Sequence, residues 1–130
     1  MLSTINELIG ENKADFYLGG LGDFDSFAYS CCKKYIAHNS NASLVFVTPY
    51  LSLEYQKNRL EYQKNLYDNI LYPNIEDKPL KFAISYRNKY MIEAADFVIA
   101  YITRDYGGAY QAVKYAKRKG KIIFNLAEMI

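Results

Sequence analysis

Two glycine-rich segments carry the residues of this chain best suited to binding a phosphate-bearing ligand. Their members are Gly19, Gly20, Gly22 and Asp23 in the first segment, and Gly107, Gly108, Ala109 and Tyr110 in the second. Glycine adopts positive φ angles and has no Cβ to hold a ligand away from the backbone. A helix is predicted after each segment, and the free N–H groups at a helix start favour anions, phosphates above all. Two such loops on neighbouring parallel strands would form one nucleotide-sized crevice, which is the site that the sequence predicts.

Arg87 and Asn88 are a polar pair suited to the same ligand. Arginine offers a planar fork to a phosphate or carboxylate, and asparagine reads the edge of a base or a ribose. The alternative for Arg87 is pairing with a surface carboxylate. Asp23 has an alternative as well, since a carboxylate at a helix start caps the helix and offsets its dipole. Arg104 and Asp105 lie in the second segment, where solvated turn residues are an alternative to a role in the site.

Two well-known nucleotide motifs are absent from the sequence. The dinucleotide fingerprint GxGxxG requires a third glycine where Asp25 stands, and the second predicted strand holds no acidic residue for a ribose. The phosphate loop GxxxxGK[ST] does not occur at all. An ordinary NAD-dependent dehydrogenase and a phosphate-loop hydrolase are therefore not expected.

No residue is assigned a catalytic or metal-binding role from the sequence alone. Cys31 and Cys32 are adjacent in a predicted helix, where a disulfide between them would be strained, and burial is expected for both. His38 is the only histidine, so no zinc site can be assembled with the two cysteines. It lies far along the same helix from either glycine-rich segment, where we expect it at the surface or with its hydrogen bonds satisfied.

Apolar runs and their spacing predict alternating strands and helices. Strands are expected over residues 14–18, 43–47, 67–72, 96–102 and 121–126, and helices at the N-terminus, from Asp25 or Ser26 to about 36, and over 51–65, 82–94 and 108–119. Several of these strands are short and apolar throughout, which is typical of a buried parallel sheet with helical crossovers. We therefore predict a single α/β domain over residues 1–130, of the three-layer Rossmann-like kind. A mostly parallel five-stranded sheet flanked by helices would form its centre.

Composition limits the classes of partner. A net charge of +2 gives no support to nucleic-acid binding, and the longest apolar run of about six residues is far too short for a membrane span. The absence of a signal peptide and the low cysteine content indicate the cytoplasm.

A repeated hexapeptide suggests a contact between subunits. The sequence Leu-Glu-Tyr-Gln-Lys-Asn occurs over residues 53–58 and again over residues 60–65. A seven-residue period keeps the leucines on one side of a helix and the tyrosines beside them. A surface helix packing its leucines on the sheet is one interpretation, and a homo-oligomer contact rich in tyrosine is the other.

The ordered motifs of the chain resemble the SLOG superfamily. Residues 87–101, followed by residues 106–110, resemble the C-terminal core of these Rossmann-like domains, which are related to the LOG phosphoribohydrolases, the "lysine decarboxylase-like" proteins and the DNA-processing protein DprA. Residues 16–25 look like the opening of small bacterial and phage-associated members. The resemblance spans about residues 14–126 and implies a nucleotide site formed by the two glycine loops and the helix of Arg87.

The same resemblance bears on turnover. Asn88 replaces the lysine of the LOG pattern, Tyr110 and Gln111 replace its Gly-Thr, and the catalytic glutamate aligns with Lys114. A lysine there cannot do the work of a carboxylate, so a sensor or sequestering domain for a nucleotide or ADP-ribose-like ligand is the leading expectation.

Two alternatives remain open. One is a nucleotide hydrolase of the LOG type that uses another carboxylate, with Asp23, Asp25 or Glu93 as candidates. The other is a DprA-like module for single-stranded DNA. It would use the basic residues Lys114, Lys117, Arg118, Lys119 and Lys121, although such a charge run is more often a solvated face.

Overall fold

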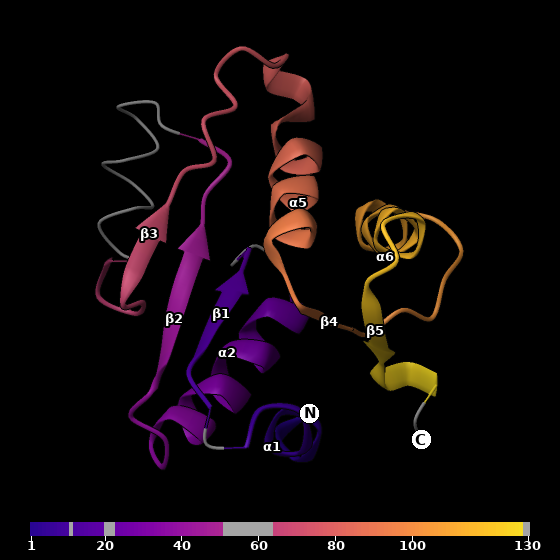
Figure 1. The fold of residues 1–130 in the computed structure, drawn as a ribbon. Coiled ribbons are helices and arrows are strands. Elements are labelled where there is room, and N and C mark those ends of the chain that lie inside the picture. The colour runs from indigo at the N-terminus through magenta and orange to yellow at the C-terminus, as the bar shows by residue number, and fades with distance from the viewer. Residues whose placement is uncertain (11, 20–22, 51–63, 129–130) are drawn as a thin grey trace. The chain divides into compact units, whose positions relative to one another are not determined.

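The computed structural model describes residues 1–10, 12–19, 23–50 and 64–128. The chain divides into two compact units, unit 1 from Met1 to Tyr72 and unit 2 from Pro73 to Ile130. Both units are built from helices and parallel strands (Figure 1). The α/β class and the parallel strands expected from the sequence are confirmed, while the assignment of residues 1–130 to a single domain stays a prediction.

Unit 1 is a three-stranded parallel sheet with two described helices. Its elements are α1 (Leu2–Ile9), β1 (Ala14–Leu18), α2 (Asp23–Ile36), β2 (Ala42–Val47) and β3 (Asn69–Leu71), and the strand order is β1-β2-β3. Helix α2 packs on β1 and β2, and α1 packs on α2 (Figure 1). The limits of β1 are those predicted. Helix α2 begins at Asp23, so Asp25 and Ser26 lie in its first turn and the expected cap at either position is wrong.

The core of unit 1 is built from the central strand and one side of α2. Leu44, Phe46 and Val47 of β2 are fully buried, because a middle strand of a covered sheet has both faces enclosed. Cys32 and Tyr35 of α2 are buried, on a helix that packs on β1 and β2. The Tyr35 ring contacts the ring of Phe16 in β1 edge-on. Both cysteines are free and buried, as predicted.

Strand β3 is shorter than predicted because Asp68 completes its start with a side chain. The Asp68 N–H donates to the carbonyl of Leu44 over 2.9 Å, and the Asp68 carboxylate accepts from the Leu44 N–H over 2.7 Å. A carboxylate thus stands where a backbone carbonyl would continue the ladder, and regular pairing begins only at Asn69.

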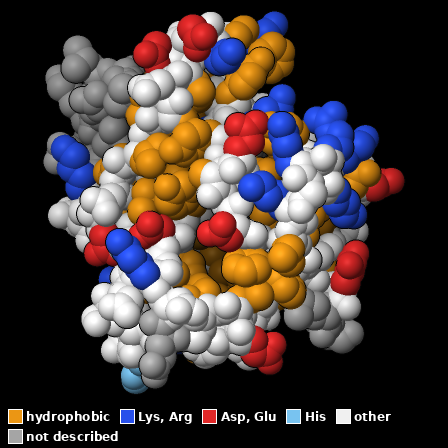
Figure 2. All heavy atoms as spheres, in the orientation of Figure 1, with side chains coloured by type: hydrophobic (Ala, Val, Ile, Leu, Met, Phe, Trp, Pro, Cys, Tyr) orange, Lys and Arg blue, Asp and Glu red, His pale blue; other side chains and the backbone are white. Residues whose placement is uncertain are grey.

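Unit 2 is a two-stranded parallel sheet with two α-helices. Its elements are the 3-10 turn η2 (Leu80–Phe82), α5 (Ala83–Ala94), β4 (Phe97–Ala100), α6 (Gly108–Arg118), β5 (Ile122–Asn125) and the 3-10 turn η3 (Leu126–Glu128). Helix α6 packs on α5 and on both strands. Basic side chains gather over α6 in Figure 2, where the sequence holds five of them between residues 114 and 121.

The single five-stranded sheet expected from the sequence is wrong. Among the described residues the five strands form two parallel sheets, of three and of two strands. The starts of β4 and β5 are open to solvent, with Phe97 40% and Ile122 54% exposed, although both were predicted as buried strand residues. An apolar run indicates a strand but does not identify the strand that it pairs with, which is the physical reason for the error.

Two further expectations, the hexapeptide repeat and the lack of a membrane span, are limited by which residues the structure describes. The hexapeptide repeat falls almost entirely on residues 51–63, which lie outside the described residues. Within the described part of the chain, none of the helices has the length and apolar character needed to cross a membrane.

Candidate functional site

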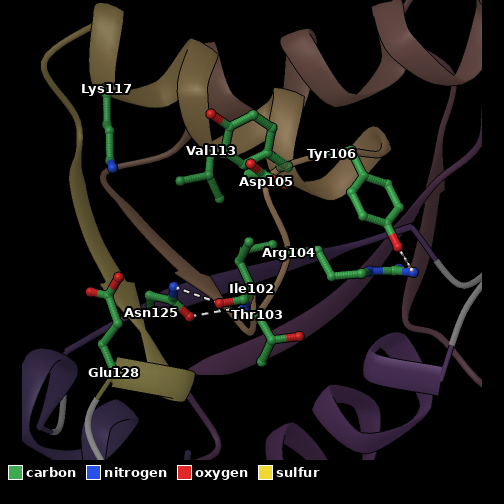
Figure 3. A pocket seen from close by; sticks show the side chains of 10 residues that line it. Ile102, Thr103, Arg104, Asp105, Tyr106, Val113, Lys117, Asn125 and Glu128 are labelled. Carbon is green, nitrogen blue, oxygen red and sulfur yellow. Dashed lines mark hydrogen bonds between the residues drawn. The ribbon is translucent and has the colours of Figure 1, made fainter.

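The carboxyl ends of β4 and β5 meet at one edge of the unit 2 sheet, because the two strands are parallel. A pocket of about 540 Å³ opens there (Figure 3). It is lined by the loop residues 102–106, by Tyr110, Val113 and Lys117 of α6, and by Asn125 and Glu128. Ligands of open parallel sheets bind at this edge, beyond the ends of the strands.

Asn125 holds two walls of the pocket together through its side-chain amide. Its Oδ1 accepts hydrogen bonds from the N–H groups of Ile102 (2.9 Å) and Ala127 (3.2 Å). Its Nδ2 donates to the carbonyl of Ile102 over 3.1 Å (Figure 3). The amide therefore extends the pairing of β4 and β5 beyond the last backbone rung, and it fixes both the loop after β4 and the start of η3.

Gly107 turns the chain from this loop into α6. Its φ of 98° lies in the region that residues with a Cβ avoid, so glycine is required for the conformation. Helix α6 has no side-chain cap and no acidic residue in its first turn. Its first N–H groups, those of Gly108, Ala109 and Tyr110, have no partner within the helix. A Cβ added at Gly108 would meet no atom within 4 Å, so packing does not explain this second glycine.

Charges of both signs line the pocket. Arg104 stacks over the exposed ring of Tyr106, with 4.9 Å from its guanidinium carbon to the ring centroid, and donates to the Tyr106 hydroxyl over 3.4 Å (Figure 3). Lys117 extends from α6 toward the end of β5 in Figure 3. In the described part of the chain, Lys117, Asp105 and Glu128 form no ion pair or hydrogen bond with another side chain.

On the helix of Arg87, the two predicted polar residues contact each other. Arg87 is 4% exposed, and its Nε donates to Oδ1 of Asn88 over 2.9 Å. Neither residue lines the pocket of unit 2. Their predicted contact with a phosphate or a sugar stays a prediction.

The first glycine loop belongs to unit 1. Gly19 follows β1 and is buried, and Asp23 is the first residue of α2. Gly20 and Gly22 lie outside the described residues. The role of this loop in ligand binding also stays a prediction.

Several lining residues were not identified from the sequence. Arg104 and Asp105 of the second segment and Lys117 of the basic run are exposed, which agrees with a solvated position, and all three also line the pocket. Asn125 could have been found, because it ends the last predicted strand and binding residues gather at the ends of parallel strands. Glu128 lies beyond that strand in η3 and left no signal.

Comparisons with protein-family models, curated proteins and solved structures gave no match for this chain. The resemblance to the SLOG superfamily therefore stays a prediction. Lys114, which aligns with the catalytic glutamate in that resemblance, is exposed on α6 and does not line the pocket. Within the described residues, no group of three or more histidine, cysteine or acidic side chains is arranged to hold a metal ion.

Proposed function

We propose that this protein binds a nucleotide or an ADP-ribose-like ligand in the pocket at the ends of β4 and β5, as a sensor or sequestering domain. The observation that carries the proposal is the pocket that Arg104, Lys117 and Tyr110 line, with Tyr110 in the uncapped first turn of α6 after Gly107. Backbone N–H groups at a helix start and flexible cations are the groups that proteins use to bind phosphates.

Aromatic side chains support the nucleoside part of the ligand. Tyr106 is 60% exposed and Tyr110 lines the same pocket, so each offers a ring for stacking with a base. The volume of about 540 Å³ falls in the range of small-molecule sites, which is about 300–1,000 Å³.

Calorimetric titration with AMP, NAD, ADP-ribose and cyclic ADP-ribose isomers tests the proposal. We expect micromolar binding of at least one ligand, and a loss of about tenfold or more in the Lys117→Met and Arg104→Ala variants, since each removes a charge-assisted hydrogen bond. Lys114→Met is the matched control, because Lys114 is an exposed lysine of the same helix that does not line the pocket. Absence of binding to every ligand, or an equal loss in the control, would contradict the proposal.

A nucleotide hydrolase is the second candidate function, and the position of two carboxylates favours it. Asp105 and Glu128 line the pocket, whereas Glu93, a candidate from the sequence, accepts a hydrogen bond from Tyr115 and pairs with Lys119 at 3.9 Å. Chromatography that detects free base or ribose phosphate after incubation with AMP or NAD would establish turnover. Binding without product would exclude it for those compounds.

The single-stranded DNA alternative gains no comparable support. The Tyr115 ring, which lies in the basic part of α6, has Lys89, Arg118 and Lys119 within 5.6 Å of its centroid. Lys114, Arg118 and Lys119 are exposed, which is typical of a solvated basic face.

A further inference from the structure

The side-chain amide of Asn125 is almost fully used by hydrogen bonds within the chain. Its Oδ1 accepts from the N–H groups of Ile102 and Ala127, and its Nδ2 donates to the carbonyl of Ile102. An amide oxygen has two lone pairs and an amide nitrogen has two hydrogens, so three of the four hydrogen-bonding positions are occupied. At most one N–H is left for a ligand. Although Asn125 lines the pocket, its contribution to binding must come mainly from what it holds in place.

The loop that Asn125 holds supplies a large part of the pocket wall. Residues 102–106 all line the pocket, and Arg104 among them is one of its two cations. Among the described residues, and outside the strand ladder, the hydrogen bonds that join this loop to another segment are the two between Ile102 and Asn125. The contact between Arg104 and Tyr106 lies within the loop. The position of the loop against the end of β5 therefore depends strongly on the Asn125 amide.

Packing contributes little to the order of this loop, because residues 103–106 are exposed. A ligand that has to order a loop loses affinity through the conformational entropy of that loop. We propose that Asn125 is a positioning residue of the site: its amide keeps the loop of residues 102–106 ordered before a ligand binds and thereby raises the affinity. This inference rests on the proposed nucleotide binding.

Asn125→Leu tests the proposal, since leucine has nearly the same size, adds no charge and removes all three hydrogen bonds. The first measurement is NMR relaxation of the ligand-free full chain. Order parameters of residues 103–106 should be close to about 0.85 in the parent and should fall toward about 0.6 in the variant. The second measurement is calorimetric titration with AMP and ADP-ribose, in which the variant should bind about tenfold more weakly than the parent.

Lys121→Met is the matched control for a loss of stability. It also removes two side-chain hydrogen bonds to backbone groups of unit 2, but Lys121 lies before β5 and does not line the pocket. Its affinities should stay within about twofold of those of the parent. Residues 103–106 should keep the order parameters of the parent as well. A merely structural role of Asn125 would give the two variants equal losses of affinity.

Asn125→Asp is the second variant, used if Asn125→Leu does not fold. It keeps the acceptor and removes the donor to Ile102, so the order parameters of residues 103–106 should again fall. Only the order parameters are compared there, because the added charge would itself repel a phosphate. Unchanged loop order, or equal losses of affinity in Asn125→Leu and Lys121→Met, would overturn the positioning role and leave nucleotide binding intact. Failure of the parent to bind either ligand would instead refute the proposed function, and this inference with it.

Discussion

Asn125 acts in this fold as if its side chain were one more peptide group of β5. Replacing it by aspartate keeps the acceptor for the N–H groups of Ile102 and Ala127 but removes the donor to the Ile102 carbonyl. We expect Asn125→Asp to lower the free energy of unfolding by about 1–3 kcal/mol at pH 7, since two acceptors then face each other. Urea unfolding followed by circular dichroism measures this.

The loss in Asn125→Asp should shrink as the pH falls below about 4, because the protonated carboxyl regains an O–H donor. A difference from the parent that stays constant between pH 7 and pH 3 would contradict the assigned hydrogen bonds.

The two glycines before α6 are expected to respond differently to alanine. Gly107→Ala forces a Cβ onto a backbone with φ of 98° and should cost about 1–2 kcal/mol in the free energy of unfolding. Gly108→Ala meets open space at a helical position, so stability should be unchanged or slightly higher. Thermal unfolding of both variants checks the pair.

The same pair of glycines also tests the site. If a phosphate contacts the backbone at Gly108, the Gly108→Ala variant should lose ligand affinity at full stability. Retention of affinity would place the phosphate elsewhere in the pocket.

At this scale the sequence predicted the edge at which the pocket opens better than it predicted the side chains that line the pocket. Gly107, Gly108 and Tyr110 were chosen because glycine before a helix has a recognisable local signature, and Tyr110 lines the pocket. Arg104 and Lys117 have no such signature. Whether a cation on a loop or a helix faces a pocket depends on how the neighbouring segments are arranged in space. The residue type alone does not give that arrangement.

At the scale of elements, Lys121 links the end of α5 to the strand that follows α6. Its ammonium donates to the carbonyls of Glu93 (3.2 Å) and Ala95 (2.9 Å), which the helix itself leaves without partners. A cation at this end also opposes the helix dipole. Lys121→Met keeps the aliphatic length and removes the donors, and we expect it to cost about 1–2 kcal/mol in chemical unfolding.

Lys78→Met is a suitable comparison for Lys121→Met. Lys78 is also in unit 2, but its ammonium is 3.9 Å from Asp77 at an exposed position, where a pair contributes little. Equal effects of the two substitutions would show that Lys121 does not stabilise the end of α5.

The limits of individual elements were largely predictable from the sequence, whereas their pairing was not. Residues 14–18 and 108–119 closely match β1 and α6, because an apolar run after a polar stretch and a glycine before amphipathic spacing are local signals. The sheet to which a strand belongs depends on contacts between distant parts of the chain. For that reason the same five strands were expected in one sheet and are found in two.

At the scale of the whole molecule, a buried thiol and a buried tyrosine hydroxyl should make the free energy of unfolding fall as the pH rises into the alkaline range. Burial raises the pKa of the Cys32 thiol from 9.0 to about 12, with the neighbouring Cys31 adding to the effect. Burial also raises the pKa of Tyr67 from 10.0 to about 12. Both groups stay neutral in the folded chain at pH values where the unfolded chain loses their protons.

Their contribution to stability is thus fully present below pH 9 and is lost as the pH rises from about 9 to about 12. Each group contributes a slope of at most about 1.4 kcal/mol per pH unit to the free energy of unfolding. Urea midpoints measured at pH 8, 9, 10 and 11 should fall less steeply for Cys32→Ala and Tyr67→Phe than for the parent. Equal slopes in all three proteins would contradict the raised pKa values.

The parallel pairing of every described strand also bears on how fast the chain folds. Ala14 pairs with Ala42, Val45 with Asn69 and Phe97 with Ile122, so each pairing closes a segment of 24 to 28 residues. Among the described strands no tight hairpin exists to provide a cheap first contact, and the entropy of closing each segment is lost before any strand pairing compensates for it. Stopped-flow refolding should therefore be slower than that of a helical bundle of equal length, and substitutions in the crossover helix α2 should slow it further.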